Sequence, residues 1–231
     1  MIKKNLKALV IAPHPDDEVL GAGGFIRKIT EQGGSVDLLI VTGSGEGVHP
    51  IWPPKSWKIS KSETKRAANI LGIDNIFYSN LPAAILDNYP NYKINKSIDF
   101  VIKKVDPELL IIPYHHDLHI DHYKVSYASL VASRPYLNVD NKLRKIIAYE
   151  TLSETNLFPS IINNSFSPDL YVDITETIKF KIEAMKQYES QCQSDLMPRS
   201  PKAIESLAHL RGTFIGVSHA EAFITLYEKI I

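Results

Sequence analysis

The chain has 231 residues, of which 44% are hydrophobic and 23% are charged. Both fractions are ordinary for a globular protein whose core needs no disulfide bonds. Lysine plus arginine and aspartate plus glutamate each number 26, so the formal net charge is zero. This balance argues against a general nucleic-acid binder. The single cysteine, Cys192, excludes an internal disulfide and a thiolate metal cluster, and it suits a reducing compartment.

The N-terminal segment and the hydropathy predict a cytoplasmic protein. Residues 1–5 are basic, but the apolar run at residues 8–12 is too short for a signal peptide. No stretch of the sequence has the length and apolar character of a membrane-spanning helix. We therefore expect one domain over residues 1–231, without stable insertion into a membrane.

Short apolar runs rich in β-branched residues alternate with segments of helical apolar spacing. Strands are predicted at residues 7–12, 36–42, 75–78, 108–113, 146–152 and 170–174. Helices are predicted at residues 18–32, 61–71, 94–105, 175–190, 198–211 and 219–229. This order predicts an α/β fold with a mostly parallel sheet and helices on both faces. The binding crevice of such a fold lies at the C-terminal edge of the strands, where residues 13–17, 43–47 and 114–122 should meet.

Charge is concentrated directly after the first predicted strand. His14, Asp16, Asp17 and Glu18 fall within five positions, and carboxylates at a strand end are costly there unless a cation compensates them. His14 and Asp17 lie three residues apart and can turn toward one point if Asp17 opens the following helix. An imidazole nitrogen and a carboxylate oxygen are normal zinc ligands.

A second cluster follows the fourth predicted strand, where residues 115–122 include four histidines and two aspartates. His119 and His122 are three apart and would share one face at the start of a helix. One further ligand from this segment would complete a His-Asp-His set with a position left for water, as in catalytic zinc sites. His115, His116 and Asp117 are expected only to shape the rim.

These residues could divide the steps of a hydrolysis reaction among them. A bound cation lowers the pKa of its water toward ~7 and polarises a carbonyl. Asp16, beside the ligand Asp17, is placed to take the proton of the water. A protonated His119 would stabilise the oxyanion, and Asp121 would orient a histidine.

The segment Ala12-Pro13-His14-Pro15-Asp16-Asp17-Glu18, with the glycines at 21, 23 and 24, resembles the signature of the PIG-L/LmbE-like N-deacetylases. The element His119-Ile120-Asp121-His122 is similar to the second motif of that family. Weaker similarities extend over the C-terminal part of the chain, at Lys181, Ala184, Tyr188, Ser190, Gln191, Gly216, Ala220, Glu221 and Phe223.

The resemblance implies a Rossmann-like sheet and a zinc enzyme that removes the acetyl group of a small N-acetylated amino sugar, with Fe²⁺ possible in the cell. It implies His14, Asp17 and His122 as the metal ligands. It implies Asp16 as the general base, and His119 as the oxyanion partner with Asp121 as its supporting carboxylate. Some members of the family assemble, so the resemblance also allows a homo-oligomer.

Substrate contacts follow from the resemblance with two departures, one of which is His219, where the family often has a tyrosine before Ala-Glu. Family members often carry an arginine before the glutamate of the second main helix, whereas this chain has Ser60-Lys61-Ser62-Glu63. Lys61 or Arg66 would then supply the positive charge. Glu46 resembles a family position that faces the sugar.

Three other functions use parts of the same pattern. A dinucleotide-binding oxidoreductase is disfavoured because the glycines at 21–24 and 43–47 lack the required spacing, and adjacent carboxylates would repel a pyrophosphate. A non-haem Fe(II) oxygenase also uses two histidines and one carboxylate. A non-catalytic metal-binding module would keep the ligands but would not need Asp16. The Pro-rich segment 49–58, with two tryptophans, is either a lid over the crevice or an ordinary loop.

Overall fold

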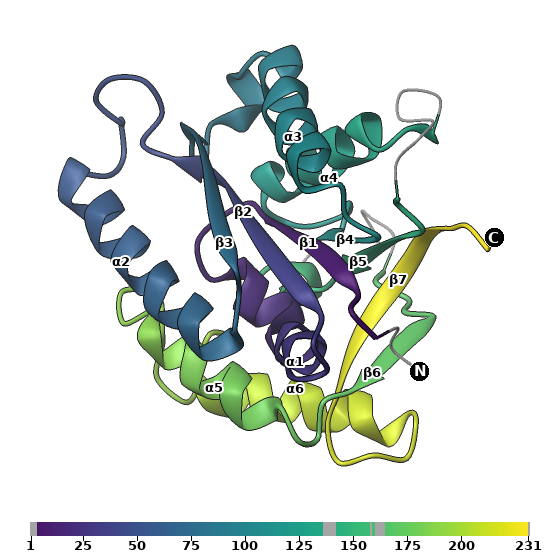
Figure 1. Ribbon diagram of the computed structural model, residues 1–231. Helices are drawn as coiled ribbons and strands as arrows, with labels where there is room; N and C mark the ends of the chain where they lie inside the picture. The colour runs from purple at the N-terminus through teal and green to yellow at the C-terminus, as the bar shows by residue number, and fades with distance from the viewer. Residues whose placement is uncertain (1–3, 136–141, 158, 160–164, 231) are drawn as a thin grey trace.

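The computed structural model describes residues 4–135, 142–157, 159 and 165–230, so part of the basic segment 1–5 lies outside it. A seven-stranded sheet in the order β3-β2-β1-β4-β5-β7-β6 forms the centre of the fold (Figure 1). The first five strands in this order are parallel, whereas β7 runs antiparallel to both β5 and β6. The predicted mostly parallel α/β sheet is therefore confirmed. The strands are β1 (Lys7–Ala12), β2 (Ser35–Gly43), β3 (Asn75–Pro82), β4 (Leu109–Pro113), β5 (Lys145–Tyr149), β6 (Leu170–Asp173) and β7 (Ala220–Glu228).

Helices cover both faces of the sheet (Figure 1). One face carries α1 (Asp17–Glu31), α2 (Pro54–Leu71), α5 (Ile178–Gln187) and α6 (Pro201–Thr213), and the other carries α3 (Asn91–Val105) and α4 (Ile120–Ala132). Two 3₁₀-helices, η1 (Leu86–Asn88) and η3 (Thr155–Leu157), lie in connections. Strand β1 shows why two helical layers are needed. Ala8 and Val10 pack on the first layer and Leu9 and Ile11 on the second, all fully buried, because successive side chains of a strand point to opposite faces.

The helix predicted at residues 219–229 is wrong, because this segment forms strand β7. Alanine, glutamate and leucine in the segment favour a helix, but Phe223, Ile224, Thr225 and Tyr227 favour a strand. Strand β7 lies between β5 and β6 and has hydrogen-bonding partners on both sides. Pairing with distant parts of the chain therefore overrides the local preference.

Helix α2 begins at Pro54, earlier than the predicted residue 61, so the second half of the Pro-rich segment 49–58 is helical. A proline is suited to the first turn of a helix because its missing N–H would have no partner there. Helix α5 starts after Thr177, later than predicted, since Asp173 instead accepts the backbone N–H of Thr175 in the preceding turn. Among the described residues no helix is long and apolar enough to cross a membrane.

The glycines of the first motif lie inside helix α1 and allow close packing. A Cβ atom at Gly21 would lie 2.1 Å from the ring of Tyr149 on β5, and one at Gly24 would lie 2.7 Å from the side chain of Ile174. The Gly-rich stretch therefore lets α1 approach the sheet. It is part of a helix, not a phosphate-binding loop.

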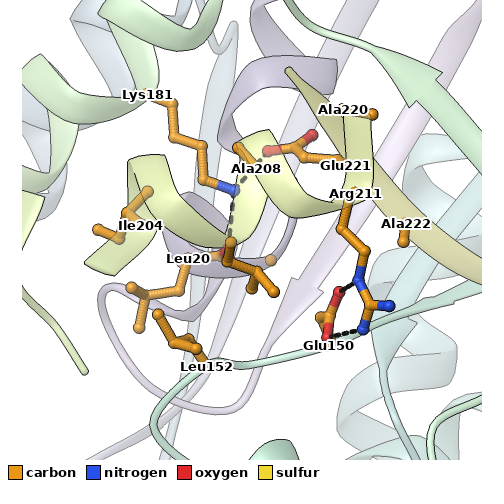
Figure 2. A pocket seen from close by; sticks show the side chains of 12 residues that line it. Leu20, Glu150, Leu152, Lys181, Ile204, Ala208, Arg211, Ala220, Glu221 and Ala222 are labelled. Atoms are coloured by element: carbon orange, nitrogen blue, oxygen red, sulfur yellow. Dashed lines mark hydrogen bonds and ion pairs between the residues drawn. The ribbon is translucent and has the colours of Figure 1, made fainter. Parts of the chain in front are cut away.

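Two buried ion pairs fasten the C-terminal part of the chain behind helix α1 (Figure 2). Lys181 Nζ lies 2.6 Å from Glu221 Oε1 and also donates to the carbonyl of Leu20 in α1 at 2.9 Å. The Glu221 carboxylate accepts the backbone N–H groups of Gly24 and Phe25, also in α1. Helix α1 is thus held by charged groups from α5 and β7. Nearby, Arg211 of α6 forms a bidentate pair with Glu150, at 2.8 and 2.7 Å.

We expect Gly21→Ala to destabilise the protein by about 1–3 kcal/mol or more, because the added methyl group overlaps the fixed ring of Tyr149. Gly23→Ala is the matched control in the same helix. Its Cβ would lie 3.1 Å from the Lys181 side chain and 3.5 Å from that of Val19, so the neighbours need to move far less, and the helix propensity of alanine offsets part of the strain. Urea unfolding of both variants measures the difference. Equal stability losses would contradict the packing role of Gly21.

Candidate functional site

Three side chains that are far apart in sequence meet at the C-terminal edge of the sheet. His14 follows β1, Asp17 opens α1, and His122 lies in the first turn of α4. Asp17 Oδ2 lies 3.2 Å from His14 Nδ1 and 3.2 Å from His122 Nε2. One possible ligand atom of each residue lies within 4.8 Å of the other two. Two imidazole nitrogens and one carboxylate oxygen around one point form the donor set of a catalytic zinc site.

The environment of His122 fits a metal ligand. Its Nδ1 lies 2.8 Å from Asp117 Oδ2, so a neutral ring carries its proton on Nδ1 and has a lone pair on Nε2. That Nε2 is buried and makes no hydrogen bond, although the Asp17 carboxylate lies beside it. Burial alone would lower the pKa of His122, but the Asp17 and Asp117 carboxylates outweigh it and raise that pKa well above its usual value. Without a metal ion a proton is therefore favoured on Nε2, in the place that a bound cation would take. Asp117, expected only at the rim, is buried here and orients His122.

The Asp121 carboxylate lies against His14 and not against His119, the partner that the resemblance implied. It lies 2.9 Å from His14 Nε2 and accepts the N–H groups of Ala84 and Leu86. The contact with His119 is made by the backbone instead, since the Asp121 N–H donates to His119 Nδ1 at 3.2 Å and thereby caps α4. His14, His119 and Asp121 form a second group with metal-binding spacing. In this group the Nε2 of His14 and the carboxylate of Asp121 are already engaged in hydrogen bonds.

Asp16 occupies a strained position beside the candidate metal ligands. Its φ of 108° lies in a region that residues other than glycine rarely adopt, and such strain is often retained at functional sites. The backbone N–H of Asp16 donates to Glu18, whose other oxygen accepts the Tyr188 hydroxyl at 2.5 Å. Tyr188 thus helps to hold the start of α1. Asp16 Oδ2 is buried and has no hydrogen-bond partner.

Arg199 is a functional candidate that the sequence did not reveal. Its guanidinium lies 3.4 Å from Asp16 Oδ2, and it donates to Gln191, Ser153 and Glu154. Burial raises the pKa of Asp16 to about 8, while Arg199 acts in the opposite direction. The residue lies in an irregular segment before α6, without any motif or periodicity that would have marked it.

The electrostatics of the other site residues follow from their neighbours. Burial alone would raise the pKa of Asp17, but the adjacent His122 and His14 outweigh it and bring that pKa well below its usual value. Burial, with His14 nearby, lowers the pKa of His119 to about 4. His119 is therefore neutral at pH 7, which differs from the protonated form expected from the sequence. Because its Nδ1 accepts the Asp121 N–H, the proton of the neutral ring sits on Nε2.

A cavity of about 370 Å³ opens beside these residues. His14, Asp16, His119 and Arg199 contribute to its lining, together with Thr42, Ala83, Ser190, Gln191 and residues of the segment 52–60. The volume falls in the range of small-molecule sites. Ser190 is held in place by Glu63 of α2, which accepts both its N–H and its hydroxyl.

The three expected substrate contacts lie outside this lining. Glu46 is exposed on the loop after β2. Lys61 Nζ lies 5.0 Å from the centre of the Tyr78 ring, and Arg66 contacts Gln187 and Glu189 at the surface. Their assignment to the substrate stays a prediction.

Comparison with known proteins gives a family model and related sequences. The model, described as GlcNAc-PI de-N-acetylase (PIG-L), matches residues 9–133, which is more than half of the chain. Diacetylchitobiose deacetylase of Thermococcus kodakarensis is 25% identical over 224 residues, which cover 93% of this chain and 81% of the relative.

Two solved structures share the fold. The N,N'-diacetylchitobiose deacetylase of Pyrococcus horikoshii superposes with a TM-score of 0.76 and 23% identity, covering 96% of this chain and 84% of that one. GalB, the 4-carboxy-2-hydroxymuconate hydratase of Pseudomonas putida, has a TM-score of 0.74 and 19% identity, covering 98% of both chains. The hydratase illustrates that a fold alone does not decide the reaction.

We expect Asp117→Asn to weaken zinc binding by about 10- to 100-fold, because the carboxylate that fixes the His122 ring is lost. Zinc affinity is measured by competition with a chelating dye on the metal-free protein. Asp87→Asn is the control, since the side chain of Asp87 is 63% exposed and pairs with Lys124 at 3.6 Å. Unchanged affinity in the Asp117 variant would contradict a ligand role for His122 Nε2.

Proposed function

This chain belongs to the PIG-L family, and we propose that it hydrolyses the N-acetyl group of an N-acetylglucosamine-type amino sugar. The products are acetate and the free amine. The proposal rests above all on the buried Nε2 of His122, which faces Asp17 and His14 without a hydrogen bond. The named activity of the Thermococcus relative supports an acetylated amino sugar as the substrate.

His14, Asp17 and His122 would hold the metal ion. We propose zinc, because two imidazoles and one carboxylate with an open position are its usual catalytic ligand set, although Fe²⁺ accepts the same donors. A cation held there lowers the pKa of a water molecule toward ~7 and polarises the acetyl carbonyl. Asp121 would orient the His14 ring, and Asp117 the His122 ring.

Asp16 is the proposed general base. Its Oδ2 is buried without a hydrogen-bond partner, and the residue lines the cavity. A cation held by the neighbouring ligands would lower the raised pKa of Asp16, and the carboxylate could then accept a proton from the water that attacks the amide carbon. When the C–N bond breaks, the same carboxyl group returns that proton to the amine nitrogen. The positive charge of Arg199 lies close enough to stabilise the carboxylate before the first transfer and after the second, when Asp16 is charged.

His119 is the proposed partner of the oxygen that becomes negative when water adds to the amide. Its protonated Nε2 can donate a hydrogen bond to this oxygen without the ring being charged, because the cap of α4 engages Nδ1. A donor fixed before the reaction stabilises the developing charge at little cost of reorganisation. A neutral histidine therefore suffices for the role that the sequence assigned to a charged one.

The primary test measures metal content and acetate release from a panel of N-acetylglucosamine derivatives, with and without chelator. We expect about one metal per chain, and acetate release that chelator abolishes and zinc restores. Activity should persist without oxygen, since hydrolysis consumes none, and this separates the proposal from an oxygenase. A protein that takes up no metal on reconstitution would refute the proposal.

Asp16→Asn is the matched variant for the same assay. We expect it to bind metal normally and to lose about 10²- to 10⁴-fold in kcat, because the amide cannot accept the proton. Retained metal with lost activity also separates an enzyme from a non-catalytic metal-binding module. Normal turnover by this variant would assign the base to another group.

Arg199→Gln tests which cation serves the reaction. We expect a loss of about 10-fold or more in kcat/KM, because a buried Asp16 is left without its positive neighbour. The control variants Lys61→Gln and Arg66→Gln should stay within about 2-fold, less than a 1 kcal/mol change in barrier, because neither residue lines the cavity. If either control lost much of its kcat/KM while the Arg199 variant stayed normal, Lys61 or Arg66 would be the substrate contact, as the sequence predicted.

A further inference from the structure

One side of the cavity is aromatic and uncharged. Trp52 and Trp57 line it, with Ser56, Ile59 and Ser60 between and beyond them. The two indole rings lie 5.8 Å apart at 81° to each other. The charged residues of the lining, Asp16 and Arg199, belong to the catalytic group. The cavity therefore combines a reactive polar part with an apolar part that the proposed reaction does not use.

His49 holds the two tryptophans in a fixed arrangement. Its ring is buried and lies 5.1 Å from that of Trp52 and 5.2 Å from that of Trp57. His49 Nδ1 accepts the N–H groups of Ile51 and Trp52, so Nε2 is the nitrogen that donates to the carbonyl of Ala83, at 3.0 Å. An aromatic surface that is held in place before binding loses little entropy when a ligand docks.

Packing alone does not explain this cluster. Trp52 is 38% exposed even though it packs on two other rings. The Nε1–H of Trp57 is shielded from solvent and has no hydrogen-bond partner, whereas buried indole N–H groups usually have one. Trp52 thus presents part of its ring at the cavity, beside an enclosed Trp57 N–H that lacks a partner.

We propose that Trp52 and Trp57 form a subsite for a second sugar ring, glycosidically linked to the N-acetylglucosamine unit that is deacetylated. This inference rests on the proposed deacetylase function and names the substrate class as a disaccharide or longer oligosaccharide. A pyranose with equatorial hydroxyls has C–H groups on its ring face that pack on an indole. The absence of charge among residues 52–60 of the lining favours a neutral sugar over a phosphate or carboxylate.

The subsite is tied to the reaction centre through one short segment. His49 binds the carbonyl of Ala83, and the next residue, Ala84, donates its N–H to Asp121, whose Oδ2 lies 2.9 Å from His14. The distance between the aromatic surface and the proposed metal ligands is therefore fixed by the backbone. A ring bound on the tryptophans would place the neighbouring acetyl group in a defined position.

Intrinsic fluorescence tests binding directly, because Trp52 and Trp57 are the only tryptophans in the sequence. The zinc-loaded Asp16→Asn protein, which should not turn over substrate, is titrated with N,N'-diacetylchitobiose and with N-acetylglucosamine. We expect a saturable change with the disaccharide, at a dissociation constant about 10-fold or more below that of the monosaccharide. No spectral change with the disaccharide, or equal affinities, would overturn the subsite whether or not the wild type releases acetate.

Kinetics on the wild-type background provide the second measurement. Trp52→Ala should lower kcat/KM for the disaccharide by about 10-fold and leave the monosaccharide nearly unchanged, while Trp52→Phe should retain most of the preference. Tyr92→Ala is the control, because this aromatic residue is 67% exposed on α3 and does not line the cavity. Equal losses on both sugars would indicate a structural role and refute the proposal. Absent acetate release from every sugar would instead refute the deacetylase function and leave the fluorescence result to decide the subsite.

Discussion

The structure depends on the burial of three consecutive carboxylates, Asp16, Asp17 and Glu18, at the start of helix α1. Their exposed fractions are 1%, 1% and 0%, and an isolated carboxylate at this depth would take up a proton to avoid the cost of a buried charge. Each carboxylate therefore has its own compensation. Asp17 lies between two histidines, Asp16 lies beside an arginine, and Glu18 accepts a tyrosine hydroxyl. The arrangement of side chains that would hold a metal ion also reduces the free-energy cost of burying carboxylates at the start of α1.

Most of this compensation comes from the C-terminal part of the chain. The Tyr188 hydroxyl donates to Glu18, and the guanidinium of Arg199 lies beside Asp16. One turn further on, Lys181 and Glu221 form hydrogen bonds with the backbone of α1. The motif-like residues of that region thus have a physical purpose, which is to hold a strained, charged helix start in one geometry. Preorganised groups of this kind gain catalytic value because they need not rearrange during the reaction.

The residues proposed to carry out the reaction and those proposed to select the substrate lie in different parts of the cavity. The polar groups that would break the amide bond come from the ends of β1 and β4 and from the first turns of α1 and α4, which are fixed by the sheet. Of the aromatic surface, Trp52 comes from the connection between β2 and α2 and Trp57 from the first turn of α2. A connection is a place where sequence can vary without disturbing the core. The same fold in a hydratase is consistent with this division, since the scaffold supplies positions and the side chains supply the reaction.

The sequence by itself determined the parallel sheet and the edge at which His14, Asp17 and His122 meet, because strand periodicity and the geometry of parallel crossovers are local and general. Tertiary structure decided the rest. Strand β7 exists because two strands flank it, against its helical composition. The partners of Asp121 and Asp117 depend on where α4 is capped, and Arg199 reaches Asp16 from an irregular segment 183 residues away. Such contacts leave no periodic trace, since they depend on side-chain distances that only the packed chain fixes.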